Sequence, residues 1–122
     1  MTQAADRWAD QAQYDLDTAR AMLDSGRYLY VLFCCQQALE KAIKAIIAKR
    51  TGEVPPRLNN LLRLAEAGNV ELAPEQAEFL AELSGYYTRT RYPEEIESMG
   101  ASATREIAQE TLRKTEEATQ WL

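Results

Sequence analysis

The chain has 122 residues, of which 46% are hydrophobic and 27% charged, and it carries a formal net charge of −5 at pH 7. This length and composition predict one globular domain over residues 1–122. The longest apolar run, residues 28–35, is too short to span a membrane, and the first ten residues lack the basic flank and apolar stretch of a secretory signal. We therefore expect a cytoplasmic protein with no membrane association.

Apolar residues recur every three or four positions along the chain, which predicts an all-α fold. A first helix is expected over residues 2–24 and should end at Ser25-Gly26, because glycine tolerates the left-handed conformation of a helix end. The second helix has the most regular apolar spacing. It is expected over residues 27–50, with Gly52 as its stop signal.

The second half of the chain predicts shorter elements. After an extended connection at the proline pair 55–56, helices are expected over residues 58–67 and 74–87. Residues 88–100, with Pro93 near the start and Gly100 as the end boundary, are expected to be irregular, and a final helix is expected over residues 101–122. The side chains expected to face the core from this helix are Thr104, Ile107, Ala108, Thr111, Leu112, Thr115, Ala118 and Leu122. Together these elements predict an up-and-down helical bundle of four to five helices.

The only two cysteines, Cys34 and Cys35, are adjacent in the second helix. Neighbouring helix positions point about 100° apart, so a disulfide between them would be strained. With no histidine and no other cysteine in the chain, a zinc site is not expected either. We interpret both residues as reduced core thiols and expect no metal and no cofactor.

Residues 86–95, YYTRTRYPEE, form the most unusual cluster of the sequence. In one interpretation Arg91 folds back and pairs with a carboxylate at the edge of an apolar stripe, for which the candidates are Asp15, Glu40 and Glu82. Tyr92, held extended before Pro93, would then pack as a plug. In the other, the arginines and tyrosines form a nucleotide- or phosphate-binding corner, because guanidinium groups match phosphate geometry and tyrosine rings stack on bases. Tyr86 or Tyr87 could then stack on a base, and the binding residues would be Arg89, Arg91 and Tyr92.

A second polar cluster lies on one face of the second helix. Residues 27–63 hold seven basic and two acidic residues, a net charge of +5 in an otherwise acidic chain. Gln37, Lys41 and Lys44 follow helical spacing within this region. They could form a basic groove with the arginine cluster, or an ordinary helix surface in which Glu40 and Lys44 pair at i,i+4.

The order and spacing of several segments resemble the HEPN family, whose name stands for higher eukaryotes and prokaryotes nucleotide-binding. These segments are QQALEKAIKA at 36–45, the proline pair followed by NNLLRL at 59–64, and RYP at 91–93. The resemblance covers nearly the whole chain and implies a helical bundle of four or five helices, usually a homodimer. Trp8, Tyr28 and Phe33 would be bulky anchors for such a dimer.

Many small prokaryotic members of that family are encoded beside a minimal nucleotidyltransferase, and several such pairs behave as toxin and antitoxin. Toxic members are ribonucleases that use an arginine followed, after four to six residues, by a histidine. This chain contains no histidine. The positions five and six residues beyond Arg89 hold Glu94 and Glu95, and a solvated glutamate titrates near pH 4.3, so it could act as a base at neutral pH but hardly as an acid.

We therefore predict no catalytic residues. The chain is expected to be a non-catalytic HEPN-type module that binds a minimal nucleotidyltransferase and a nucleotide or RNA, through Arg89, Arg91, Tyr92, Lys41, Lys44 and Gln37. Two alternatives stay open. One is a ribonuclease toxin in which glutamate or tyrosine replaces histidine, and the other is a structural adaptor bundle without affinity for nucleotides.

Overall fold

The computed structural model describes residues 3–88 and 92–122, and these residues form six helices and no strand. The helices are α1 (Gln3–Asp24), α2 (Tyr28–Thr51), α3 (Leu61–Ala67), α4 (Pro74–Thr88), α5 (Pro93–Ser102) and α6 (Arg105–Trp121). The predicted all-α fold is confirmed, with six helices in the described part of the chain where four to five were expected.

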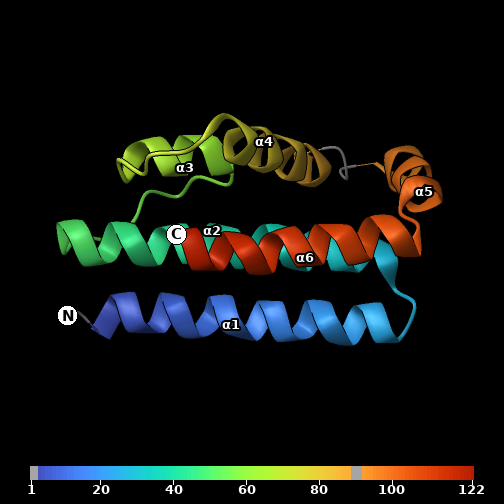
Figure 1. Cartoon of the computed structure of the whole chain (residues 1–122), viewed down its shortest axis with the longest axis horizontal. Coiled ribbons are helices and arrows are strands. Elements are labelled where there is room, and N and C mark those ends of the chain that lie inside the picture. The colour runs from blue at the N-terminus through green and yellow to red at the C-terminus, as the bar shows by residue number, and fades with distance from the viewer. Residues whose placement is uncertain (1–2, 89–91) are drawn as a thin grey trace.

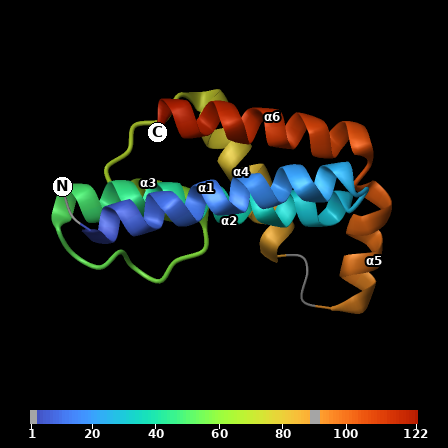
Figure 2. The ribbon, with the colours of Figure 1, turned by 90° about the horizontal axis from the view of Figure 1, so that it is seen from below.

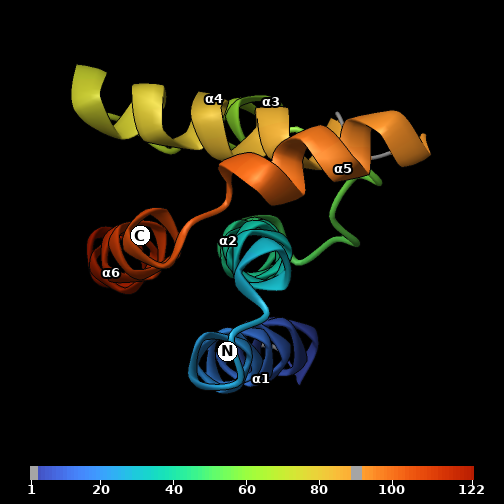
Figure 3. The same ribbon diagram turned by 90° about the vertical axis from the view of Figure 1, so that its right-hand side faces the viewer.

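The three long helices α1, α2 and α6 lie side by side with similar axis directions (Figure 1). α1 and α2 form an antiparallel hairpin, and α6 runs in the same direction as α2 (Figures 1 and 2). α3 and α4 lie on the side of α2 opposite to α1, and α5 crosses one end of the bundle. An end-on view places α2 in the middle of this arrangement (Figure 3).

Glycines set the ends of the first two helices as predicted. Gly26 has φ 78° and Gly52 has φ 69°, both in the left-handed region that side chains disfavour. The amide of Gly52 donates a hydrogen bond to the carbonyl of Ala48 at 2.9 Å, which satisfies one of the last carbonyls of α2.

The segment expected to be irregular contains a helix, so that prediction is wrong. α5 spans Pro93–Ser102, with Pro93 in its first turn, where the missing amide costs nothing because helix N-termini have free amides anyway. Glu94 and Glu95 favour the same turn through the helix dipole. Gly100, interpreted as a boundary, lies inside α5.

Two other helix starts also differ from the prediction. α6 begins at Arg105 because the Thr104 hydroxyl accepts a hydrogen bond from the amide of Ile107 at 3.3 Å. Thr104 is therefore an exposed cap, and Ile107 is 39% exposed. Both residues were predicted to face the core, and for these two the prediction is wrong. α3 begins at Leu61 because the Asn60 side chain caps it by accepting from the amide of Arg63.

α2 packs against each of the other described helices. Its fully buried side chains include Val31, Leu32, Leu39 and Ile43. The predicted core positions Ala108, Thr111, Leu112, Thr115 and Ala118 of α6 are also buried. α2 is thus the central element on which the other helices are assembled.

Both cysteines are free, as predicted, although only Cys35 is fully buried. Burial raises the pKa of the Cys35 thiol to about 12. The pKa of Cys34 is also raised, by burial and then by the nearby carboxylate of Asp15. None of the helices in residues 3–88 and 92–122 is long and apolar enough to cross a lipid bilayer.

Replacing Leu39 by alanine is expected to lower the free energy of unfolding by about 3 kcal/mol, because it opens a cavity at the centre of α2. Val54→Ala is the control, since Val54 is 87% exposed and should change stability by less than about 0.5 kcal/mol. Urea denaturation followed by circular dichroism measures both. Equal effects of the two substitutions would contradict the central position of α2.

The raised thiol pKa values predict slow alkylation. At pH 8 the thiolate fraction of Cys35 is expected to be about 10⁻⁴, so a thiol reagent should label the folded Cys34→Ser variant more than 100-fold more slowly than the urea-unfolded one. Mass spectrometry over time measures the difference. Labelling at equal rates in the two states would show that Cys35 is accessible.

Candidate functional site

The predicted binding residues lie in three places. Arg89 and Arg91 fall outside the described residues, so the position of the arginine pair stays a prediction. Tyr92 is the residue before the first turn of α5 and has the expected extended backbone, but its side chain is 62% exposed, so the prediction that it packs as a plug is wrong. Gln37 is exposed on α2, whereas Lys41 is half-buried and Lys44 is only 7% exposed.

Lys41 lies between α1 and α2. Its Nζ atom is 2.7 Å from Asp15 Oδ2, and it also donates to Gln11 Oε1 at 3.4 Å. The contact with Asp15 is a close charge pair without hydrogen-bond alignment. Both side chains are largely removed from water, with exposures of 20% and 14%. The positive charge of Lys41 is therefore already compensated from within the bundle.

Lys44 is held in the same way. Its Nζ atom donates to Glu40 Oε2 at 3.1 Å, which confirms the predicted i,i+4 pair, and lies 5.3 Å from the centre of the Trp8 ring. A cation over an indole face is stabilised by the ring quadrupole, more strongly when water is excluded. Trp8 thus secures α1 to α2 through a lysine that the sequence alone assigned to a binding face.

The three carboxylates proposed as partners of Arg91 are all in use within the described structure. Asp15 pairs with Lys41, Glu40 pairs with Lys44, and Glu82 Oε1 accepts a hydrogen bond from the hydroxyl of Tyr86 at 3.3 Å. Any ion pair of Arg91 lies outside the described residues.

A polar connection that sequence reasoning missed positions the start of α3. Gln36 is completely buried, and its Nε2 donates to the carbonyl of Asn59 at 2.9 Å. Ser84 of α4 accepts from the amide of Leu61 at 2.9 Å. The Leu61 amide is one of the donors that a helix N-terminus leaves without an internal partner, and Ser84 satisfies it. The bond from Gln36 fixes the carbonyl of Asn59, just before α3. In the sequence, the sign of this connection is a glutamine within an apolar run, but its partner is 23 residues away along the chain and could not be identified.

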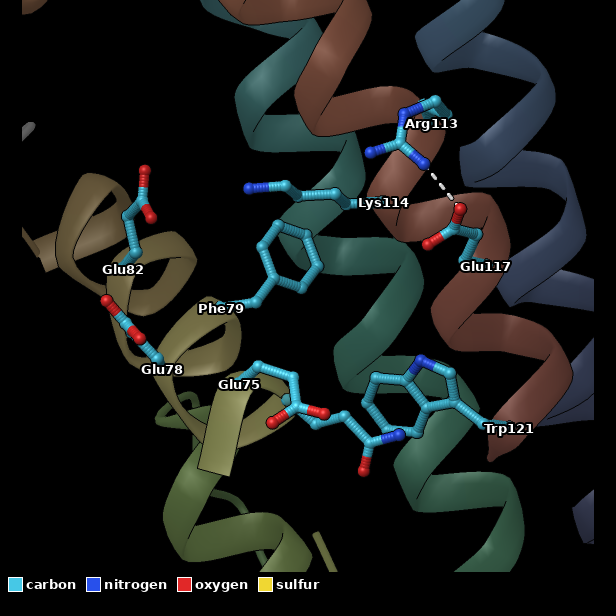
Figure 4. Close-up of a pocket in the computed structure, with 9 residues that line it drawn as sticks. Glu75, Glu78, Phe79, Glu82, Arg113, Lys114, Glu117 and Trp121 are labelled. Atoms are coloured by element: carbon cyan, nitrogen blue, oxygen red, sulfur yellow. Dashed lines mark hydrogen bonds and ion pairs between the residues drawn. The ribbon is translucent and has the colours of Figure 1, made fainter. Parts of the chain in front are cut away.

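A groove of about 450 Å³ between α4 and α6 was also missed (Figure 4). Glu75, Glu78, Phe79 and Glu82 line it from α4, and Arg113, Lys114, Glu117 and Trp121 line it from α6. Lys114 Nζ lies 5.8 Å from the centre of the Phe79 ring. The four glutamates outnumber the two basic residues, so the groove has a net negative charge.

Comparisons with known proteins agree with the fold. The model of the HEPN domain matches residues 5–122. The crystal structure of TT1696 from Thermus thermophilus is similar, with a TM-score of 0.84 and 28% sequence identity, over 98% of this chain and 96% of that chain. No curated protein sequence matches this chain.

Replacing Lys44 by methionine is expected to lower the free energy of unfolding by about 2 kcal/mol, because the largely buried Glu40 carboxylate loses its partner. Adding Glu40→Gln should restore more than half of that loss. Urea denaturation measures both variants.

Lys49→Met is the matched control, since Lys49 is exposed on the same helix and its removal should cost no more than about 1 kcal/mol. If Lys44→Met cost no more than this control, the Lys44 charge would be free for a ligand.

Proposed function

Because the chain belongs to the HEPN domain family, we propose that it is a non-catalytic member that acts by binding. Its partner would be a minimal nucleotidyltransferase in a toxin–antitoxin-like pair, and its ligand a nucleotide or RNA. The observation that carries this proposal is the absence of histidine from all 122 residues. Without imidazole, the arginine–histidine pair that the family resemblance leads one to expect in a ribonuclease cannot be assembled.

The surroundings of the glutamates support the same conclusion. Glu94 is exposed to solvent in the first turn of α5, and Glu95 follows it in the same turn. A carboxyl group becomes an effective acid at neutral pH when it is enclosed in an apolar pocket or forced beside another carboxylate. Glu94 is exposed at the N-terminus of α5, so it is not enclosed in an apolar pocket.

Nucleotide binding would depend on the residues that are not used within the bundle. Tyr92 offers an exposed ring for stacking on a base, and Gln37 offers an exposed amide on α2. Arg89 and Arg91 are the proposed phosphate contacts. Lys41 and Lys44 would then act indirectly, by holding α1 and α2 in place.

The homodimer that the family resemblance implies has support in exposed aromatic residues. Tyr30 is 55% exposed and meets the half-buried Phe33 edge-on, with ring centres 5.8 Å apart. Large aromatic side chains at a surface are typical centres of protein interfaces. We propose that this part of α2 contributes to self-association.

The proposal predicts that the purified protein does not cleave RNA at neutral pH. At 1 mM, a nucleotide that binds with a Kd of about 0.1 mM should raise Tm by about 5 °C. The double substitution Arg89→Ala with Arg91→Ala should abolish this shift, whereas Arg57→Ala, an exposed arginine in the α2–α3 connection, should preserve it.

RNA cleavage that persists through purification and disappears in a folded Arg91→Ala variant would instead identify a ribonuclease with an unusual active site. If no nucleotide raised Tm, only the protein-binding part of the proposal would remain. That part is tested by co-purification of a nucleotidyltransferase from the native host.

A further inference from the structure

The groove between α4 and α6 has two walls that come from distant parts of the sequence. Both helices pack on α2. In Figure 3, α6 is seen end-on while α4 runs across the view, so the two helix axes cross. The space between them has a volume of about 450 Å³. From Glu75 to Glu82 the α4 wall extends over eight residues, or about 10 Å of helix.

One aromatic ring stands on each wall. Phe79 projects from α4 and Trp121 from the end of α6, and both are half-buried (Figure 4). The ring of Phe79 already has a cation near it, since Lys114 Nζ lies 5.8 Å from its centre. The aliphatic part of a lysine chain can lie along such rings while its charged end reaches water or a carboxylate. Lys114 therefore shows within this chain how an ammonium group fits the groove.

The charges of the groove favour further cations. Glu75, Glu78 and Glu82 lie on one face of α4, because they are separated by three and four residues. On the other wall, Arg113 is held between Glu110 and Glu117, which neutralise it. Four carboxylates against two basic side chains leave a net charge of −2 on the lining, and this repels phosphate groups.

We propose that this groove is a docking site for a basic segment of a partner protein. Lysine or arginine side chains spaced by about one helical turn would place their charged ends beside Glu75 and Glu78, and their aliphatic parts beside Phe79 and Trp121. Charge complementarity is the argument for this occupant, and the two rings favour side chains with an apolar stem over a bare cation. The site is independent of Arg89, Arg91 and Tyr92, so the inference does not rest on the proposed function.

The test uses an amphipathic helical peptide that contains alanine, leucine and three lysines at i, i+4 and i+7, and no tryptophan. The chain has two tryptophans, so a Trp8→Phe background leaves Trp121 as the single fluorescent reporter inside the groove. We expect saturable changes of Trp121 fluorescence with a Kd of about 10–100 µM, a value typical of a small and polar contact. A peptide with glutamine in place of lysine should bind at least tenfold more weakly.

The decisive comparison matches two variants in net charge. Glu75→Gln with Glu78→Gln should weaken binding of the lysine peptide at least tenfold. Asp6→Asn with Asp10→Asn removes the same two charges from exposed positions on α1 and should change the affinity less than twofold. Circular dichroism confirms that each variant is folded, and Phe79→Leu should weaken binding without any change of charge.

Four outcomes would overturn the proposal. These are no binding up to 1 mM peptide, equal weakening by the two double substitutions, equal binding of the glutamine peptide, and displacement of the peptide by spermine at a similar concentration. The last would identify a site for small polycations. A fifth outcome would also overturn it: if the Glu75/Glu78 variant changed the mass of the protein in light scattering while peptide binding stayed the same, the groove would be a contact between copies of this chain.

Discussion

The packing of every other described helix against α2 is the constraint on which the rest of the structure depends. Most side chains of α2 are at least partly removed from water, although Tyr30 and Gln37 are exposed. Apolar residues such as Leu39 and Ile43 satisfy this requirement directly. Polar residues on the same helix must find partners, because a buried polar group without one costs about 1–3 kcal/mol. Gln36 Nε2 follows that rule through the carbonyl of Asn59, and Lys44 follows it through Glu40 and Trp8. Gln36 Oε1 is an exception, because it is buried with no hydrogen-bond partner among the described residues.

This constraint changes the interpretation of the basic region around α2. The charge of +5 over residues 27–63 suggested a face for phosphate, but two of its lysines are already paired, Lys41 with Asp15 of α1 and Lys44 with Glu40 of α2. Arg50 is also engaged, since its guanidinium donates to the carbonyls of Gly68 and Asn69. A sum of formal charges along the sequence does not distinguish a lysine that closes a helix pair from one that faces solvent. Only the positions of the opposing side chains in the folded bundle make that distinction.

Local signals in the sequence predicted what depends on neighbouring residues. The glycines at 26 and 52 gave the ends of α1 and α2, and apolar spacing gave most of the core of α6. α5 was missed because Pro93 and Gly100 were interpreted as breaks, although proline is favoured in a first helical turn and glycine is tolerated inside an exposed helix. The α4–α6 groove could not be predicted, because Phe79 and Trp121 line the same space only through the packing of both helices on α2.

The same division explains how a member of this family can retain its bundle without histidine. The residues that hold the helices together, such as Lys44 and Gln36, are buried and their partners are fixed, so their replacement lowers stability. Tyr92 and Gln37 are exposed, so the packing of the helices depends little on their side chains. Residues at such positions can be exchanged at little cost in folding free energy, since exposed substitutions usually change it by less than about 0.5 kcal/mol. The absence of an imidazole from an exposed edge is therefore compatible with an intact core, as the proposed binding role requires.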